Sequence, residues 1–114
     1  MPSFGQLLRE KRREARISQR DLAARAKVDF SYISKLENER MPPPAADTVV
    51  VICRVLNVDP AELLAAARKL RPEVEFTLGS SAAAQSFLEN ASRMGLTDEE
   101  WRDLTSHLHR LREN

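Results

Sequence analysis

The spacing of apolar residues predicts short amphipathic helices along most of the chain. Within residues 1–71 apolar side chains return every three or four positions, and Ser18 and Asp59-Pro60 provide signals for helix starts. Five helices are expected, at about 4–16, 19–26, 30–38, 46–56 and 60–70. The fourth contains the almost wholly apolar run VVVICRVL, so we expect it to form the buried centre of one compact domain despite its β-branched residues.

The second and third expected helices form a distinct motif. They are joined by only three residues, Lys27-Val28-Asp29, and their apolar positions place one face of each helix against the other. The small Ala23 is expected where the two helices cross most closely, and the outer face of the third helix is polar. The apolar positions are Leu22, Ala23, Ala26, Val28, Ile33 and Leu36. The pattern therefore predicts a helix-turn-helix.

The C-terminal part of the chain has a different pattern. Pro72 interrupts the helical spacing, and the alternation in residues 73–78 favours a linker over residues 72–80, or a short edge strand. A helix is expected over 81–94, closed by Gly95, and a second after the capping-box sequence TDEE that starts at Thr97. These two helices should form a hairpin in residues 81–114. Its apolar faces are too small for an independent core, so it should pack on the fifth helix or on a second copy, and we favour the second copy.

Charge separates the two parts. Residues 1–71 hold 14 Lys and Arg against nine Asp and Glu, a net charge of +5, whereas residues 72–114 hold four against eight, a net charge of −4. The basic part is suited to phosphates, and the acidic part should point away from them. Solvated helix faces of unrelated sign are the simpler interpretation of the same numbers.

Composition and candidate chemistry favour a cytoplasmic binding protein. No apolar run is long enough to span a membrane, and the N-terminus lacks the pattern of a signal peptide. Cys53 lies in an apolar run and is expected to be a packed thiol. His107 and His109 point to nearly opposite sides of a helix, so they should not chelate one metal together. We therefore expect no enzymatic activity and no cofactor.

The helix-turn-helix segment resembles the lambda-repressor-like, or Cro/xenobiotic-response-element, family of DNA-binding domains. SQRDLAARA is similar to the family's positioning helix and FSYISKLENE to its recognition helix, and the resemblance extends over residues 4–70. It implies a partly buried ion pair between Arg12 and Glu37. It also places Lys27 where the family usually has glycine, a position of positive φ that costs other residues roughly 1 kcal/mol.

The resemblance also implies contacts with double-stranded DNA. Phe30, Ser31 and Lys35 correspond to base-reading positions, with Ser34 as a weaker candidate. Lys35 would donate to guanine, and Phe30 would touch a thymine methyl group. The positions that correspond to backbone contacts are Gln19, Asn38 and Arg40, and Arg20 would add unspecific positive charge.

Each of these residues also has a structural interpretation. Asp29 is better explained as the N-cap of the third helix than as a base contact, and Phe30 could be a hydrophobic staple. Lys35 could be a solubilising residue, although the resemblance favours a base contact. Tyr32 could face the sugar-phosphate backbone or pack beneath its helix, and the sequence leaves both open.

These features predict a sequence-specific transcriptional regulator, a repressor that binds a pseudo-palindromic operator as a homodimer through residues 81–114. Half-sites roughly 34 Å apart would suit such a dimer. The alternative is a protein-interaction adaptor or antitoxin that uses the same fold and holds a partner through its C-terminal segment. An antagonist or a protease acting near residues 74–81 is a further candidate partner.

Overall fold

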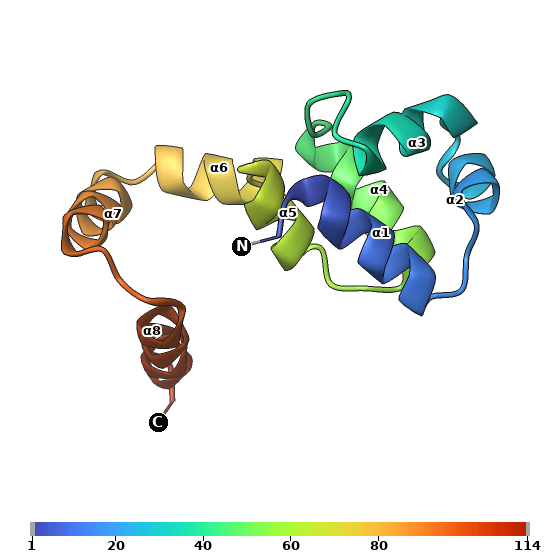
Figure 1. Ribbon diagram of the computed structural model, residues 1–114. Helices are drawn as coiled ribbons and strands as arrows, with labels where there is room; N and C mark the ends of the chain where they lie inside the picture. The colour runs from blue at the N-terminus through green and yellow to red at the C-terminus, as the bar shows by residue number, and fades with distance from the viewer. Residues whose placement is uncertain (1, 114) are drawn as a thin grey trace. The chain divides into compact units, whose positions relative to one another are not determined.

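The structure of the protein, a computed structural model, describes residues 2–113. Met1 and Asn114, at the outer ends of the predicted segments, lie outside the described residues. Two compact units are present, one ending at Val74 and one beginning at Glu75, and their helices are labelled in Figure 1. The helices are α1 (Phe4–Glu14), α2 (Gln19–Ala26), α3 (Phe30–Glu37), α4 (Ala46–Leu56), α5 (Ala61–Ala67), α6 (Pro72–Gly79), α7 (Ala82–Met94) and α8 (Asp98–Arg110). Residues 2–113 contain no strand, so the predicted all-α fold is confirmed.

The first unit is built around one apolar core to which α1 to α5 all contribute. Its centre is α4, which buries Val49, Ile52, Cys53 and Leu56, as the sequence predicted. The opposite side of this helix is not covered, as the partly exposed side chain of Val51 shows. The core consists of Phe4, Leu8, Leu22, Ala23, Ala26, Ile33, Leu36, Val49, Ile52, Cys53, Leu56, Leu63, Leu64 and Ala67.

Local capping signals fix several of the helix starts. The Ser18 hydroxyl accepts a hydrogen bond from the Asp21 amide at 3.0 Å, and the Asp59 carboxylate accepts one from the Ala61 amide at 2.8 Å. Thr97 and Glu100 form the predicted reciprocal capping box at α8. Asp29 occupies the N-cap position of α3, but its side chain makes no capping hydrogen bond. Asp29 is therefore the N-cap residue of α3, as predicted, although its carboxylate does not bond the first amides of the helix.

A glycine allows α1 to approach the end of α3. A Cβ atom added to Gly5 would lie 2.5 Å from the Leu36 carbonyl oxygen and 2.8 Å from that of Glu37. Both atoms belong to the backbone, so they cannot move aside without shifting α3. The position of α3 against α1 therefore depends on the absence of a side chain at residue 5.

The alternative of an edge strand after Pro72 is wrong, because the segment expected to be a linker, residues 72–80, is the helix α6 as far as Gly79. Proline has a φ suited to the first turn of a helix, and a lone strand would leave its backbone groups without partners. In a helix the backbone N–H and C=O groups bond to one another. This segment therefore forms the helix α6 although none of its residues is buried. The segment considered for proteolysis, residues 74–81, is therefore helical as far as Gly79.

Two other helices are shorter than predicted. The first ends at Glu14 because Arg16 adopts a left-handed conformation with φ 58°, and α5 ends at Ala67 because Arg68 has φ 56°. Neither residue is a glycine, so the sequence contains no obvious signal for these ends.

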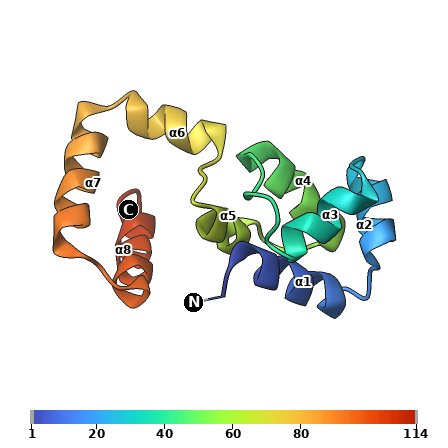
Figure 2. The same ribbon diagram turned by 45° about the horizontal axis from the view of Figure 1, so that its top comes forward.

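The second unit, described as far as residue 113, has almost no core of its own. Of its residues only Ala91 is buried. An apolar groove of about 330 Å³ lies between Phe87 of α7 and a row of α8 residues that includes Trp101, Leu104 and Leu108 and is continued by Leu111 just after the helix. Figures 1 and 2 show α7 and α8 as separate rods joined by a short turn. This turn contains Gly95, which closes α7 as predicted and has a left-handed conformation with φ 60°.

Candidate nucleic-acid interface

The corner between α2 and α3 presents one face of α3 to solvent. Lys27 takes the left-handed conformation expected at this turn, with φ 59° and ψ 44°. The Val28 amide then donates to the Ala23 carbonyl at 3.0 Å, which closes the end of α2. Ile33 and Leu36 on the inner face of α3 are fully buried. Figures 1 and 2 both show α2 and α3 side by side at the surface of the first unit.

The opposite face of α3 carries the predicted base-reading residues. Phe30, Ser31 and Lys35 are exposed, and Ser34 is half-buried. Residues spaced by three and four positions are neighbours on a helix surface, and the pairs 30/34, 31/34 and 31/35 have these spacings, so these four side chains form a continuous surface. We call them the α3 outer face. Three side chains of the α3 outer face are accessible to a ligand without any rearrangement of the core.

A buried carboxylate beneath α3 connects three helices. The Glu37 side chain has no exposed surface. Arg12 of α1 donates to it twice, from Nε to Oε2 at 2.6 Å and from Nη2 to Oε1 at 3.0 Å. Gln19 Nε2 of α2 donates to Oε1 at 3.0 Å, and Arg9 Nε donates to the same oxygen at 3.4 Å. The ion pair that the resemblance implied is therefore present, within a larger cluster.

The contacts in this cluster determine the charge of Glu37. Burial by itself would raise the pKa of Glu37, but hydrogen bonds from Arg12 and Gln19, the positive charge of Arg12 and the hydrogen bond from Arg9 outweigh it. The net result is a pKa below the ordinary value of 4.5. Glu37 is therefore a charged, fully paired group that fixes the end of α3 against α1 and α2.

The same cluster orients two of the predicted backbone-contacting residues. One amide hydrogen of Gln19 is used by Glu37, which leaves its second N–H for an outside acceptor. Asn38 accepts from Arg9 Nη2 at 2.8 Å through Oδ1 and donates to the Ser34 carbonyl at 2.9 Å through Nδ2. The third predicted contact, Arg40, is exposed just beyond α3. The structure therefore holds Gln19 and Asn38 in fixed orientations beside the α3 outer face.

Arg20 and Phe30 join the N-terminal ends of α2 and α3. The guanidinium carbon of Arg20 lies 4.4 Å from the centroid of the Phe30 ring, within the range of a cation–π contact. Phe30 keeps 40% of its surface exposed, so the ring is not the buried staple that the sequence left open. Tyr32 is partly buried against the core, which favours packing over a role on the surface. Burial raises the pKa of its hydroxyl.

Two residues of this region were not identified from the sequence. Arg9 contacts both Glu37 and Asn38, and Gly5 allows the close approach of α1. The spacing of Arg9 and Arg12, three residues apart on one helix face, was an available signal for a shared carboxylate partner. The need for glycine at residue 5 could not be inferred without the path of α3.

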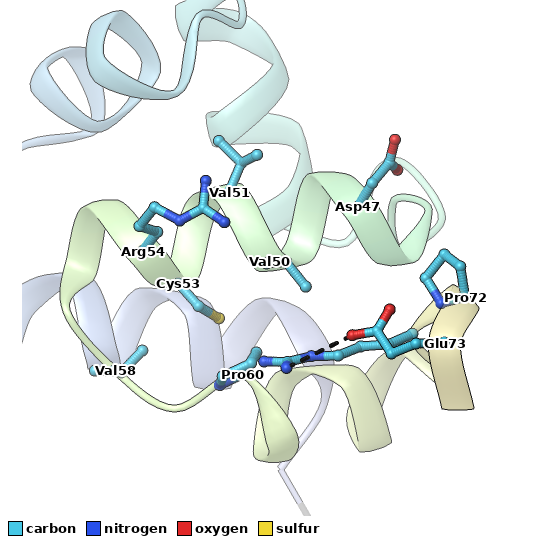
Figure 3. A pocket seen from close by; sticks show the side chains of 10 residues that line it. Asp47, Val50, Val51, Cys53, Arg54, Val58, Pro60, Pro72 and Glu73 are labelled. Atoms are coloured by element: carbon cyan, nitrogen blue, oxygen red, sulfur yellow. Dashed lines mark ion pairs between the residues drawn. The ribbon is translucent and has the colours of Figure 1, made fainter. Parts of the chain in front are cut away.

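A pocket beside α4 is separate from these residues. Cys53 lines a pocket of about 500 Å³ with Val50, Val58 and Pro60, and Figure 3 shows the Cys53 side chain pointing into it from α4. The thiol is buried, and burial raises its pKa to about 11. None of the pocket residues belongs to the α3 outer face or to the predicted backbone contacts. Cys53 is therefore a packed thiol, as predicted.

Groups suited to metal chemistry are absent from the described part of the chain. Residues 2–113 contain no set of three or more His, Cys, Asp or Glu placed to hold a metal ion. His107 and His109 are both exposed on α8.

Of the helices within residues 2–113, none has the length and apolar character needed to cross a membrane.

The fold of the first unit and the corner between α2 and α3 are similar to those of known proteins. The helix-turn-helix family model matches residues 8–63. The chain is 34% identical over 89 residues to RghRB, an HTH-type transcriptional regulator of Bacillus subtilis, and 33% identical over 88 residues to y4dL of Sinorhizobium fredii. These matches cover 78% and 77% of this chain but only 64% and 43% of the relatives, so the chain spans less than two thirds of either relative.

Solved structures extend the comparison. The regulator of biofilm formation SinR, in a crystal structure of its complex with DNA, is 31% identical with a TM-score of 0.51, and the match covers 54% of this chain and 97% of that one. ClgR, the clp gene regulator of Corynebacterium glutamicum, is 28% identical with a TM-score of 0.50 over 57% of this chain and 83% of its own. The chain belongs to the lambda-repressor-like family of helix-turn-helix proteins.

Proposed function

We propose that the protein is a transcription repressor that inserts α3 into the major groove of a specific operator. The observation that carries this proposal is the α3 outer face, which is open to solvent while the inner face of the same helix is buried. A helix in this setting can bring side chains to base edges without unfolding. The net positive charge of residues 1–71 and the likeness to SinR, which was crystallised with DNA, support the same proposal.

The proposed roles follow from the donors and acceptors of each side chain. Lys35 donates to O6 or N7 of guanine, Ser31 donates or accepts, and Phe30 contacts a thymine methyl group. Ser34 is a secondary contact because it is half-buried.

The proposed phosphate contacts flank these residues. Gln19 uses its free amide hydrogen, and Asn38 and Arg40 bind phosphate beyond the end of α3. These contacts set the register of the protein on the duplex, whereas the α3 outer face supplies the sequence preference.

The second unit is proposed to join two copies of the chain. Phe87, Leu108 and Leu111 expose 51%, 61% and 76% of their surfaces, which is unusual for an isolated soluble unit. A unit of this size needs further apolar contacts to be stable, and a second copy supplies a matching face by two-fold symmetry. Two first units would then bind the two halves of a pseudo-palindromic operator.

DNA recognition can be tested by selecting bound duplexes from a random pool. We expect a defined sequence, with Lys35→Ala lowering affinity for the selected duplex by about 5- to 150-fold. The control is Lys69→Ala, which removes the same charge from an exposed position outside α2 and α3. Lys69→Ala should change the affinity of the protein for DNA only slightly, and by the same factor for selected and scrambled duplexes. Equal, weak binding of the wild-type protein to every duplex would contradict the proposal.

The dimer can be tested by measuring the mass of the free protein in solution. Leu108→Asp should convert a dimer to a monomer and weaken operator binding, because it buries a charge in the proposed interface. Ser106→Asp, on an exposed position of the same helix, should leave the dimer intact. A wild-type protein that is monomeric at all concentrations would contradict the dimer.

The same exposed apolar faces support the second candidate, an adaptor or antitoxin that holds a different protein through α7 and α8. The two candidates differ in their DNA binding. A monomer without any duplex preference would favour the adaptor, whereas a dimer with a defined operator would exclude it as the main activity.

A further inference from the structure

Among the arginines of the first unit, Arg20 differs in what its side chain contacts. Arg9 and Arg12 are bound to Glu37, and Arg25 pairs with Asp21 at 3.1 Å. Within residues 2–113 no hydrogen bond or ion pair is found for the Arg20 side chain, whose contact is the face of the Phe30 ring at 4.4 Å. The ring restricts the position of the guanidinium but uses none of its N–H donors. All five donors remain available to an outside acceptor.

The stack lies where DNA is proposed to enter. Arg20 is the second residue of α2 and Phe30 is the first residue of α3, so both side chains stand at the N-terminal ends of the two helices. Phe30 is also the first residue of the α3 outer face. A guanidinium held over this ring is therefore adjacent to the proposed base-reading surface rather than on the far side of α2.

The separation between the Arg20 guanidinium carbon and the Phe30 ring is of the same order as the step between successive bases. The guanidinium lies 4.4 Å from the ring centroid, and successive bases of one DNA strand are about 3.4 Å apart along the helix axis. If Phe30 contacts one base pair, a group stacked on its ring is at the level of the next. Arginine is suited to this position because it can stack on an aromatic face and still donate two parallel N–H bonds from its edge.

We propose that Arg20 is a base-reading residue that donates to O6 and N7 of a guanine, next to the thymine whose methyl group contacts Phe30. The stacked pair would thus read two successive base pairs, a thymine–guanine step in each half-site. This inference rests on the proposed function, and it changes the role of Arg20 from unspecific charge to sequence recognition. A phosphate contact by Arg20 is the opposing result that the experiment distinguishes.

The experiment uses the full chain and compares duplexes selected from a random pool by wild-type protein, Arg20→Ala and Arg20→Lys. We expect adjacent thymine and guanine in each half-site selected by the wild type. Replacing that guanine should reduce wild-type affinity by about 5- to 150-fold and should hardly affect Arg20→Ala. Arg20→Lys keeps the charge but lacks the paired donors, so its guanine preference should fall while its overall salt dependence is kept.

Two further variants separate stacking from charge. Arg25→Ala removes an exposed arginine of the same helix that is paired with Asp21, and it should leave the selected sequence unchanged. Phe30→Leu keeps an apolar contact for the thymine methyl group but removes the ring, so it should weaken the guanine preference more than the thymine preference. Circular dichroism of each variant verifies that the helices are intact.

The outcomes distinguish this inference from the proposed function. If the wild type selects an operator and Arg20→Ala selects the same one with uniformly lower affinity and a smaller salt dependence, Arg20 contacts phosphate and the inference is overturned. An operator without a thymine–guanine step would overturn it as well. If the wild type selects no sequence at all, the proposed function fails and the inference fails with it.

Discussion

Replacing Arg12 by alanine would leave a fully buried carboxylate without its main partner. Arg12 Nε is the donor within residues 2–113 that reaches Glu37 Oε2, whereas Gln19 and Arg9 both donate to Oε1. Breaking a buried pair from one side typically costs about 3–5 kcal/mol. Because small domains unfold with about 5–15 kcal/mol, we expect Arg12→Ala to lose a large fraction of the stability of the first unit.

The loss of stability caused by Arg12→Ala should depend on pH. In the wild type the pKa of Glu37 lies below its ordinary value of 4.5, so its stabilising contribution is complete above that pH and is lost as pH falls through the lowered pKa. Arg12→Ala removes the Arg12 hydrogen bond and charge that oppose the effect of burial, so the pKa of Glu37 should rise. The variant then carries a penalty at pH 7 that protonation removes near pH 4. The difference between variant and wild type should therefore shrink on acidification.

Urea unfolding followed by circular dichroism at pH 7 and pH 4 measures both effects. Arg13→Ala is the control, since it removes a neighbouring arginine that is exposed on α1, and it should cost less than about 0.5 kcal/mol. The double variant Arg12→Met with Glu37→Leu should recover most of the loss, because no buried charge remains. A loss below about 1 kcal/mol for Arg12→Ala at pH 7, or an equal loss at both pH values, would show that Arg12 is not the main partner of the Glu37 carboxylate.

Three other predictions concern the first unit. Gly5→Ala should lower the free energy of unfolding by about 1–3 kcal/mol, because the new Cβ atom would meet two backbone oxygens of α3. Urea unfolding measures this loss of stability. An unchanged unfolding midpoint would contradict the prediction. Lys27→Gly should raise that free energy by roughly 1 kcal/mol, since Lys27 has φ 59°, and thermal unfolding should show a higher midpoint rather than a lower one. The Cys53 thiol is buried and has a pKa of about 11, so it should react with a thiol reagent at pH 8 only after urea unfolds the protein. Rapid labelling of the native protein would contradict the packed position of Cys53.

The helix-turn-helix could be predicted from the sequence because its determinants are local. Leu22, Ile33 and Leu36 recur at helical spacing, and Ser18 caps the helix that directly follows it. The helix α6 could not be predicted in this way. Its residues alternate in polarity over a short stretch, and none of them is buried, so no core contact gave the sequence a helical pattern.

The polar cluster depended on tertiary structure and was only partly predicted. The pair of Arg12 and Glu37 came from the family resemblance, whereas the contacts of Arg9 and Gln19 with the same carboxylate require the relative positions of α1, α2 and α3. The stack of Arg20 on Phe30 likewise joins residues ten positions apart across a turn. The sequence indicated which residues face outward but not how their side chains contact one another.

We propose that DNA binds to the exposed side of α2 and α3. The most direct test is a nuclear magnetic resonance titration of the isotope-labelled full chain with its selected duplex. We expect the largest shifts of backbone amide signals in residues 19–20 and 30–40, with small shifts in α8. Shifts concentrated in α7 and α8, with residues 30–40 unchanged, would contradict it.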